Sequence, residues 1–561
     1  MRTGIAGFDG LLGGGLPRDR TTLVVGGPGC GKSLFALESL VNGARKFAEP
    51  GIFVAFEESG KHVIANSASF GWDLPRLMKK DLAFVDARLP HAVVHGGDFD
   101  LLGLLAIVDA KRKELGARRV VLDGVDILLG FLNDPIAERR EMYRLSEWLS
   151  DQKLTSIITC KSDENGRLMA REGYMQFLSD CVVVLQHKVV GSLPLRLMRV
   201  TKCRGLAHVT GEVPFAITTS GLKVVSSGVT EAQPVSNQKV SSGIGRFDSM
   251  LSGGYFRGAS VLISGSSGTA KSTLAGGFIE AAAARGEPCL YATFDESAGQ
   301  VVRNMASVGI HLAKHLESGV LQIMSERKVE KSPVEHVARL MEMVERHKVR
   351  CLVVDPVSAL TASGAGPITE ELVVRLLDYA RARGVTLLCT SLLTGAGDHL
   401  EETASGVSTM ADTWIHVSYV VKNGERNRAL TIVKSRGVGH SNQVRELVLS
   451  NEGVTLADVY SAGGDVLMGT MRWQKESEGR QARSLKKRDA ERKGREAQLA
   501  VAETNAHIAT LRHELAGREA AVLEFSADAT KAAAEVQDRG ADERRLRRGD
   551  AESPSARKRS S

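Results

Sequence analysis

An internal repeat constrains this 561-residue chain more than any other feature of its sequence. The segment TGIAGFDGLLGGGLPRDRTTLVVGGPGCGKS at Thr3–Ser33 aligns without gaps on SGIGRFDSMLSGGYFRGASVLISGSSGTAKS at Ser242–Ser272. Other strings recur in the same order, with FEES at Phe56 matched by FDES at Phe294 and TKCRG matched by VKSRG. A period of roughly 240 residues is too long for a solenoid unit, so it predicts a duplicated globular domain.

Each copy alternates short Val/Ile/Leu runs with longer segments of helical period, as in TTLVVGG followed by KSLFALESLVNGARKF. Because parallel strands need crossover helices, this alternation predicts an α/β fold whose mostly parallel sheet is flanked by helices. We expect a first P-loop domain over residues 1–225 and a second over 242–470. The polar segment 226–241 between them is expected to be a linker, and 471–561 a separate tail.

The tail differs in composition from the two copies, since Arg, Lys, Glu, Ala and Gln dominate it after about Met471. Apolar residues recur there every seven positions, with two more at the complementary heptad positions: Val501, Ile508, Leu515 and Val522, then Leu511 and Phe525. This spacing predicts a basic helical segment that forms a short coiled coil. A solvated helix or a disordered charged tail has the same composition, and the final SPSARKRSS is expected to be disordered.

Composition predicts a cytoplasmic protein without a membrane segment. No run of about 18 uncharged apolar residues is present, and the opening MRTGIAGFDG lacks the apolar stretch of a secretion signal. The seven cysteines are scattered singly, so we expect reduced, buried thiols. The net charge of +7 is small for this length and much of the basic density lies in the tail, so charge does not indicate nucleic acid.

The string GGPGCGKS fits the pattern G-x-x-x-x-G-K-S, follows a predicted strand and opens a predicted helix. Backbone N–H groups of such a loop turn toward phosphates, Lys32 reaches the β- and γ-phosphates, and Ser33 ligates Mg²⁺. The first copy is therefore predicted to bind ATP and Mg²⁺. Its predicted ATP-binding residues are Gly26, Gly27, Pro28, Gly29, Cys30, Gly31, Lys32 and Ser33.

The second loop, GSSGTAKS, has Ala270 where the pattern requires glycine, but its place in the repeat supports the same role. Lys271 and Ser272 are expected to act as Lys32 and Ser33 do, and Thr273 offers a further hydroxyl. The predicted ATP-binding residues of this copy are Gly265, Ser266, Ser267, Gly268, Thr269, Ala270, Lys271, Ser272 and Thr273.

Acidic residues follow two predicted strands in each copy. Asp123 and Asp355 end apolar strands and are expected to hold Mg²⁺ through water, together with the P-loop serines. A carboxylate of the acidic pair after the preceding strand can deprotonate or orient the attacking group, although a solvated acidic turn is the alternative. The predicted catalytic residues are Glu57, Glu58, Asp295 and Glu296.

Late in each copy, the pattern K-x-R-G supplies Lys202 with Arg204 and Lys434 with Arg436. These cations are far from their own P-loop in sequence. They are either arginine-finger-like groups that reach a neighbouring subunit's γ-phosphate or part of a solvated basic turn.

Together these features resemble the KaiC family of bacterial circadian clock proteins, which belongs to the RecA-like ATPases. The resemblance covers about residues 1–460. It is carried by SFGWDL at Ser69, the FEES and FDES strings, RGLAH at Arg204, SRGVGH at Ser435 and GVSTMADT at Gly406. It implies two tandem RecA-like domains in a homohexameric double ring, with ATP between subunits. It also implies slow ATP hydrolysis in the first ring and phosphorylation of an adjacent serine and threonine in the second.

The resemblance assigns Ser408 and Thr409 as the phosphoacceptors, and aligning the copies through their shared aspartates places Gln176 and Phe177 opposite them. It further implies that both acidic pairs are catalytic. The implied ATP-sensing residues are Lys202, Arg204 and His208 in the first copy and Lys434, Arg436 and His440 in the second. Asp295 replaces the family's usual glutamate, and the C-terminal segment is unlike the family's regulatory tail.

The leading hypothesis is therefore a hexameric ATPase and serine/threonine autokinase that signals to an unidentified protein partner. A RecA-like motor acting on DNA is one alternative. It would need a basic and aromatic surface, whereas aromatic residues make up 5% of the chain and no such patch is visible within the copies. A nucleotide-gated scaffold without kinase activity is the other alternative, since the heptads of the tail suit partner recruitment.

Overall fold

The computed structural model divides into two compact units, Met1–Val459 and Tyr460–Ser561. It describes residues 1–88, 101–132, 134–163, 173–190, 193–226, 236–327, 331–361, 367–393, 407–422, 424–462 and 465–546. Most of the predicted linker, Gly406 of the GVSTMADT string, and the end of the predicted tail lie outside these residues. The predicted domain boundaries therefore remain predictions.

The first half of the larger unit contains a sheet of nine described strands in the order β3-β2-β4-β5-β1-β6-β7-β8-β9. The strands from β3 to β6 run parallel, and those from β6 to β9 run antiparallel. Their bounds are β1 Thr21–Gly26, β2 Gly51–Ala55, β3 Leu82–Asp86, β4 Arg119–Asp123, β5 Thr155–Lys161, β6 Cys181–Val190, β7 Leu193–Cys203, β8 Val213–Thr218 and β9 Gly221–Val224.

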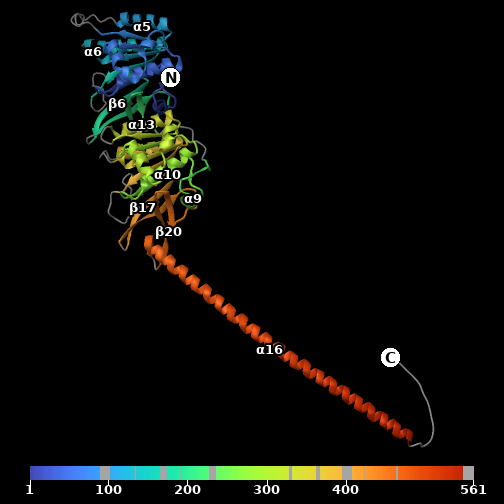
Figure 1. Ribbon diagram of the computed structural model, residues 1–561. Helices are drawn as coiled ribbons and strands as arrows, with labels where there is room; N and C mark the ends of the chain where they lie inside the picture. The colour runs from blue at the N-terminus through green and yellow to red at the C-terminus, as the bar shows by residue number, and fades with distance from the viewer. Residues whose placement is uncertain are drawn as a thin grey trace, which may run out of the picture. The chain divides into compact units, whose positions relative to one another are not determined.

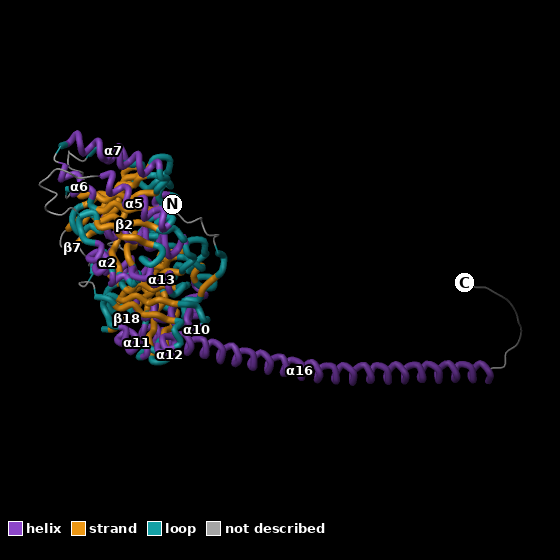
Figure 2. Tube along the Cα trace, turned by 90° about the horizontal axis from the view of Figure 1, so that it is seen from above, coloured by secondary structure: helices purple, strands orange, loops and turns teal. Residues whose placement is uncertain are grey.

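Helices cover the faces of this sheet (Figure 2). Because both faces are covered, the central strand β1 is buried at every position and reads as a continuous apolar run rather than an alternating one. The helices are η1 Asp9–Leu12, α1 Lys32–Phe47, α2 Gly60–Asn66, η2 Ala68–Phe70, α3 Leu74–Leu77, α5 Leu101–Leu115, α6 Val125–Leu132, α7 Pro135–Asp151 and α8 Met175–Leu178.

The second half repeats the same strand order, β14-β13-β15-β16-β12-β17-β18-β19-β20, with the same change from parallel to antiparallel pairing. Its strands are β12 Ser260–Gly265, β13 Cys289–Thr293, β14 Leu321–Ser325, β15 Cys351–Asp355, β16 Thr386–Leu392, β17 Thr413–Lys422, β18 Glu425–Ser435, β19 Arg445–Ser450 and β20 Gly453–Asp458. A separate pair joins β10 Lys239–Val240 to β11 Tyr255–Phe256. The predicted tandem α/β fold is thus confirmed (Figure 1).

The helices of the second half are α9 Gly245–Met250, α10 Lys271–Ala284, α11 Ala298–Ala306, α12 Ala313–Glu317, α13 Pro333–Arg346, η3 Val357–Leu360, α14 Pro367–Ala382 and α15 Val407–Met410. Local sequence explains where two of them begin. Ser297 and Gln300 form a capping box at the start of α11, and Ser332 and Glu335 form another at α13. Each box satisfies backbone N–H groups that the first helical turn leaves without partners.

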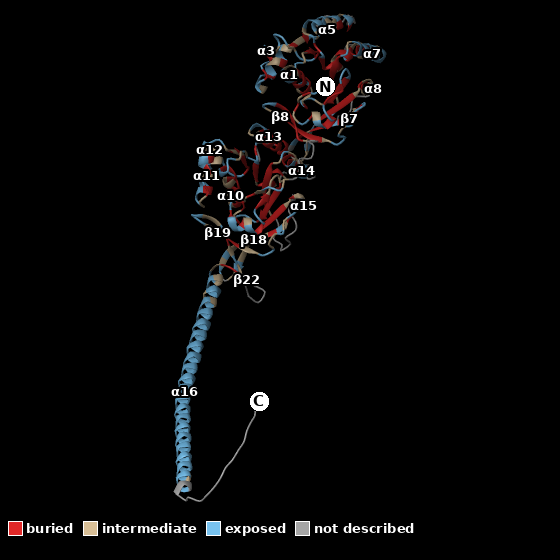
Figure 3. Ribbon diagram, turned by 90° about the vertical axis from the view of Figure 1, so that its right-hand side faces the viewer, coloured by how far each residue is buried: buried red, intermediate tan, exposed pale blue. Residues whose placement is uncertain are grey.

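The smaller unit contains a hairpin of β21 Tyr460–Ala462 and β22 Asp465–Leu467, followed by the helix α16 Gly469–Leu546. This helix has 78 residues, and most of its described side chains are exposed (Figure 3). The heptad residues Val501, Ile508 and Leu515 are among its exposed apolar side chains. The predicted helical tail is confirmed, while its pairing into a coiled coil remains a prediction.

Two further expectations from composition can be compared with the structure. All seven cysteines are buried and none forms a disulfide, as predicted. Among the described helices, none combines the length and the apolar character needed to cross a membrane.

Candidate ATP sites in the two halves

The register of the first sheet brings the ends of four strands to one edge. Gly26 of β1 lies beside Lys161 of β5, and Ala55 of β2 lies beside Asp123 of β4. The P-loop follows β1 at this edge, where open α/β sheets bind their ligands. A cavity of about 440 Å³ opens here, a volume typical of small-molecule sites. The predicted residues that line it are Pro28, Gly29, Gly31, Lys32, Ser33, Glu57, Glu58 and Asp123.

The first P-loop is shaped by glycines in the left-handed region, with φ of 68° at Gly29 and 103° at Gly31. Lys32 begins α1, and its Nζ donates to the carbonyl oxygens of Gly26 at 2.9 Å and Gly27 at 3.0 Å. The ammonium group therefore lies over the loop, within reach of a phosphate bound in it. The sequence predicted this grouping.

Asp123 is buried at the end of β4, and its Oδ1 accepts a 2.6 Å hydrogen bond from the hydroxyl of Thr159 on β5. Burial raises the pKa of Asp123, while hydrogen bonds from Thr159 and Ser33 act in the opposite direction. The Ser33 hydroxyl and the Asp123 carboxylate thus face each other. Both are hard oxygen donors, so the donor set fits Mg²⁺ shared with nucleotide phosphates.

The two acids of FEES have different partners. Glu57 forms a 2.8 Å ion pair with Lys161, which raises the pKa of Lys161, and Glu58 accepts a 3.4 Å hydrogen bond from Asn66 of α2. Sequence reasoning missed both partners. Asn66 had a detectable signal, because an asparagine follows the second acid by eight residues in both copies.

The second P-loop repeats this arrangement. Lys271 is buried, and its Nζ donates to the carbonyl oxygens of Gly265 at 2.9 Å and Ser266 at 2.7 Å. Burial lowers the pKa of Lys271. Ala270 has a φ of 77°, so it adopts the left-handed conformation that glycine normally supplies here. The departure from the motif therefore keeps the loop's shape at the expense of local strain.

We expect Ala270→Gly to stabilise the second half by about 0.5–1 kcal/mol, because release from left-handed strain outweighs the added entropy of the unfolded chain. Denaturant unfolding followed by a probe in the second half measures the change. The matched control, Ala281→Gly inside α10, is expected to destabilise by about 1 kcal/mol. A loss of stability in Ala270→Gly as large as in the control would contradict this explanation.

The acids of the second half lie at the corresponding edge of their sheet. The Oδ1 of Asp355 accepts a hydrogen bond from Thr390, the counterpart of Thr159, and its Oδ2 accepts one from Tyr291 at 2.6 Å. Glu296 accepts a 3.2 Å hydrogen bond from Asn304, as Glu58 does from Asn66. Asp295 precedes it in the same turn. Sequence reasoning missed Thr390 and Tyr291.

The K-x-R-G cations lie at the opposite end of each sheet from their own P-loop. Cys181 at the start of β6 lies beside Thr22 of β1 and opposite Cys203 of β7, so the flanking cations Lys202 and Arg204 are near the start of β1. Four residues of strand, about 13 Å, separate Thr22 from the P-loop end at Gly26. The two predicted groups are therefore not brought together within one chain.

These cations contact the short helices α8 and α15, which carry the aligned positions. In the first half, Lys202 Nζ donates to the carbonyl oxygens of Gln176 at 2.7 Å and Ser179 at 2.6 Å, and Arg204 donates to that of Phe177 at 3.1 Å. In the second half, Lys434 Nζ donates to the carbonyl oxygens of Ser408 at 2.9 Å and Thr409 at 3.1 Å, and Arg436 donates to that of Thr409 at 3.0 Å. The lysine contact to Gln176 or Ser408 and the arginine contact to Phe177 or Thr409 recur, which supports the alignment of Gln176 with Ser408.

The predicted phosphoacceptors differ in exposure. Ser408 is buried and Thr409 is exposed, both on the short helix α15. The two histidines of the predicted sensing groups make only local contacts, since Nδ1 of His208 lies 3.4 Å from the oxygen of Leu206 and Nδ1 of His440 lies 3.4 Å from that of Val438.

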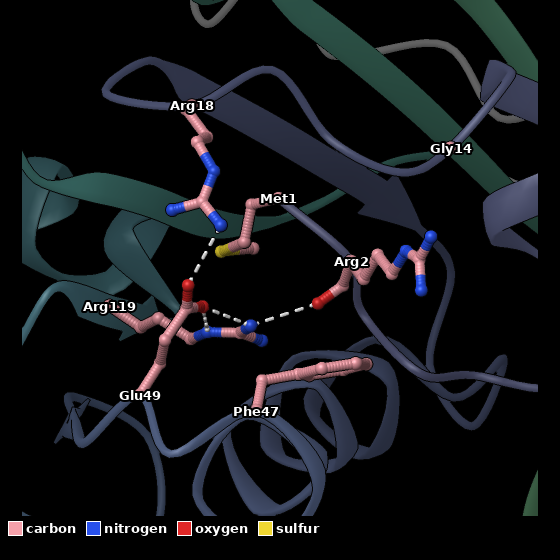
Figure 4. Close-up of a pocket in the computed structure, with 7 residues that line it drawn as sticks. All are labelled: Met1, Arg2, Gly14, Arg18, Phe47, Glu49 and Arg119. Carbon is pink, nitrogen blue, oxygen red and sulfur yellow. Dashed lines mark hydrogen bonds and ion pairs between the residues drawn. The ribbon is translucent and has the colours of Figure 1, made fainter.

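A different cavity, of about 390 Å³, is lined by Arg119 together with Arg18, Phe47 and Glu49 (Figure 4). The guanidinium is buried and donates to the carboxylate of Glu49, to the carbonyl oxygen of Ser39 at 2.8 Å and to that of Arg2 at 2.9 Å. Arg18 also contacts Glu49, at 2.9 Å. Since Arg119 begins β4 and Asp123 ends it, this cluster lies away from the ATP site and ties neighbouring segments together.

Comparison with known proteins agrees with these features. A family model described as the KaiC ATPase matches residues 1–229 and 240–460. The circadian clock protein KaiC2 of Synechocystis is 39% identical over 503 residues, which cover 88% of each chain. The circadian clock oscillator proteins KaiC of Parathermosynechococcus lividus and Synechococcus elongatus are 34% and 33% identical over 473 residues, covering 84% of this chain and 87% and 91% of theirs.

Proposed function

The chain belongs to the KaiC family of ATPases, and we propose that it hydrolyses ATP in its first half and phosphorylates itself on Ser408 and Thr409 in its second. One observation carries the division. Both halves have a P-loop, paired acids and similar cation contacts, but at the two aligned positions only the second half has hydroxyl side chains, Ser408 and Thr409. In the first half those positions are Gln176 and Phe177, which cannot accept a phosphoryl group.

In the first half, Lys32 and the P-loop N–H groups hold the phosphates, and Ser33 with Asp123 holds Mg²⁺. The metal, when bound, neutralises charge on the phosphates. Glu57 and Glu58 line the same cavity, so either carboxylate can accept a proton from an attacking water. Asn66 and Lys161 fix the orientation of these acids.

In the second half, Lys271 holds the phosphates, and Ser272 with Asp355 holds the metal. Glu296 accepts the proton of the serine or threonine hydroxyl, and Asp295 shares the same turn. The γ-phosphoryl group then passes from ATP to the hydroxyl oxygen, and ADP leaves.

The acceptors and the sensing cations have to meet the nucleotide of another copy. Both groups lie at the start of the central strand, whereas the P-loop follows the end of that strand. A ring in which each chain presents Lys202, Arg204, Lys434 and Arg436 to its neighbour's ATP satisfies this geometry. We propose that the chain forms a homohexamer with ATP between subunits, as its resemblance to the family implies. We further propose that this hexamer acts in the cytoplasm on a signalling protein partner.

The test is mass-spectrometric mapping of phosphate on dephosphorylated protein incubated with Mg²⁺-ATP, with Lys271→Ala and Glu296→Gln alongside. We expect phosphate on Ser408 or Thr409 in the wild type and on neither residue in the two variants. ATP turnover with both hydroxyls unmodified would contradict the autokinase and favour the nucleotide-gated scaffold. Light scattering with Mg²⁺-ATP gives the number of chains in the ring.

The C-terminal helix suits recruitment rather than catalysis. Its exposed heptad residues, which include Val522 and Phe525, suit a coiled coil with another helix. We propose that this segment carries the contact with the signalling partner. A pull-down that succeeds equally well after removal of residues 471–561 would contradict that assignment.

A further inference from the structure

Tyr291 gives Asp355 of the second half a hydrogen-bond partner that Asp123 of the first half does not have from its own neighbouring strand β2. Its ring is fully buried within a core cluster that includes Leu274 and Phe278 of α10, the helix that follows the P-loop. Its hydroxyl donates to Oδ2 of Asp355 at 2.6 Å, while Thr390 donates to Oδ1. Both oxygens of the carboxylate therefore accept a hydrogen bond from a neighbouring strand.

The first half lacks this hydroxyl because Phe53 occupies the equivalent position. Phe53 lies beside Val121 on β4 just as Tyr291 lies beside Val353 on β15, two residues before the acid in each case. Oδ1 of Asp123 accepts a hydrogen bond from Thr159, and Phe53 has no hydroxyl that could donate to Oδ2. Its carboxylate interacts with the Ser33 hydroxyl at the metal position.

We propose that Tyr291 is a positioning residue that engages one oxygen of Asp355 and weakens the second half's hold on Mg²⁺-nucleotide. A carboxylate oxygen that already accepts a short hydrogen bond from Tyr291 has less acceptor capacity left for a metal-bound water. A hydrogen bond to a charged group corresponds to about a tenfold change in an equilibrium constant. The two halves then fill with Mg²⁺-ATP at different concentrations of free Mg²⁺.

This inference rests on the proposed function only in taking the second half to be a nucleotide site. It does not need phosphorylation. When free Mg²⁺ falls, the second half releases Mg²⁺-nucleotide first, while the first half keeps its Mg²⁺-nucleotide and continues to hydrolyse ATP. Tyr291 thereby makes the second reaction responsive to the divalent cation.

The experiment follows retention of a fluorescent ATP analogue by the full chain as Mg²⁺ is titrated. A Lys32→Ala background removes the signal of the first site. We expect Tyr291→Phe to lower the half-saturating Mg²⁺ concentration about tenfold. The matched control is Tyr255→Phe, which removes a hydroxyl from a buried tyrosine that also packs on Phe278 and is expected to leave the titration unchanged.

If Tyr291→Phe folds poorly, the reverse substitution in the first half tests the same proposal. In a Lys271→Ala background, Phe53→Tyr is expected to raise the Mg²⁺ requirement of the first site about tenfold. An unchanged or increased requirement in Tyr291→Phe, or an unchanged one in Phe53→Tyr, overturns the proposal. A shifted titration without phosphate on Ser408 or Thr409 would instead remove the autokinase and leave the role of Tyr291 standing.

Discussion

Replacing Glu57 and Glu58 together by glutamine is expected to lower ATP turnover by about 10²-fold or more, because a positioned general base contributes that much to proton transfer. Glutamine keeps the size of each side chain and one oxygen that accepts hydrogen bonds, but it cannot accept the proton of an attacking water. Steady-state release of inorganic phosphate from Mg²⁺-ATP measures the change. The residual rate then reports the hydrolysis that the second half performs.

The matched control for this variant comes from the second half. Glu296→Gln is expected to retain most of the turnover while it loses phosphorylation, since the first half carries the hydrolysis. Asn304, which donates to Glu296 at 3.2 Å, can also donate to the glutamine oxygen, so the local fold is preserved. Equal loss of turnover in the two variants would contradict the division of chemistry between the halves.

Glu49→Gln is expected to destabilise the first half by about 3–5 kcal/mol, because it leaves the buried guanidinium of Arg119 without its counter-charge. The Arg119 side chain is only 2% exposed, and that of Glu49 is 13% exposed. Denaturant unfolding measures the loss. Glu212→Gln is the control: its ion pair with Lys188 is 38% exposed on both sides, so we expect a change of less than about 1 kcal/mol.

The same pair gives a prediction about pH. Burial alone would raise the pKa of Glu49, but hydrogen bonds from Arg119 and Arg18 outweigh it, and the net shift is downward. A carboxyl with a lowered pKa stabilises the fold above its unfolded pKa and loses that contribution as pH falls through the folded value. The difference in stability between wild type and Glu49→Gln should therefore shrink in acid. A difference that grows below pH 4 would contradict this account.

Much of the fold follows from the sequence because the two copies report on each other. The P-loop context and the strands that end in acids predict candidate ATP sites, and the structure brings these residues to one edge of each sheet. The conformation of the loop that contains Ala270 could also be predicted, because its gapless alignment with the first P-loop requires the same backbone. The repeat thus identifies the second loop as a P-loop, which the second copy alone, with alanine in place of glycine, would not have established.

Other parts of the site depend on register, which the sequence does not state. Tyr291 reads as an ordinary apolar strand residue until its strand is placed beside that of Asp355. Lys161 likewise gains its partner Glu57 only when β5 takes its place between β4 and β1. The position of Lys202 at the far end of the sheet follows from the antiparallel return of β7, which reverses its direction relative to the P-loop.

The central claim, that acceptors are phosphorylated by a neighbouring chain, is tested most directly by complementation in mixed rings. A Lys271→Ala chain with intact acceptors is expressed separately from an isotope-labelled Ser408→Ala/Thr409→Ala chain whose P-loops are intact, and the two purified chains are mixed and assembled together. After dephosphorylation and incubation with Mg²⁺-ATP, we expect phosphate on Ser408 or Thr409 of the Lys271→Ala chain in the mixture but not alone. Absence of phosphate in mixed rings, while wild-type rings phosphorylate themselves, would contradict transfer between chains.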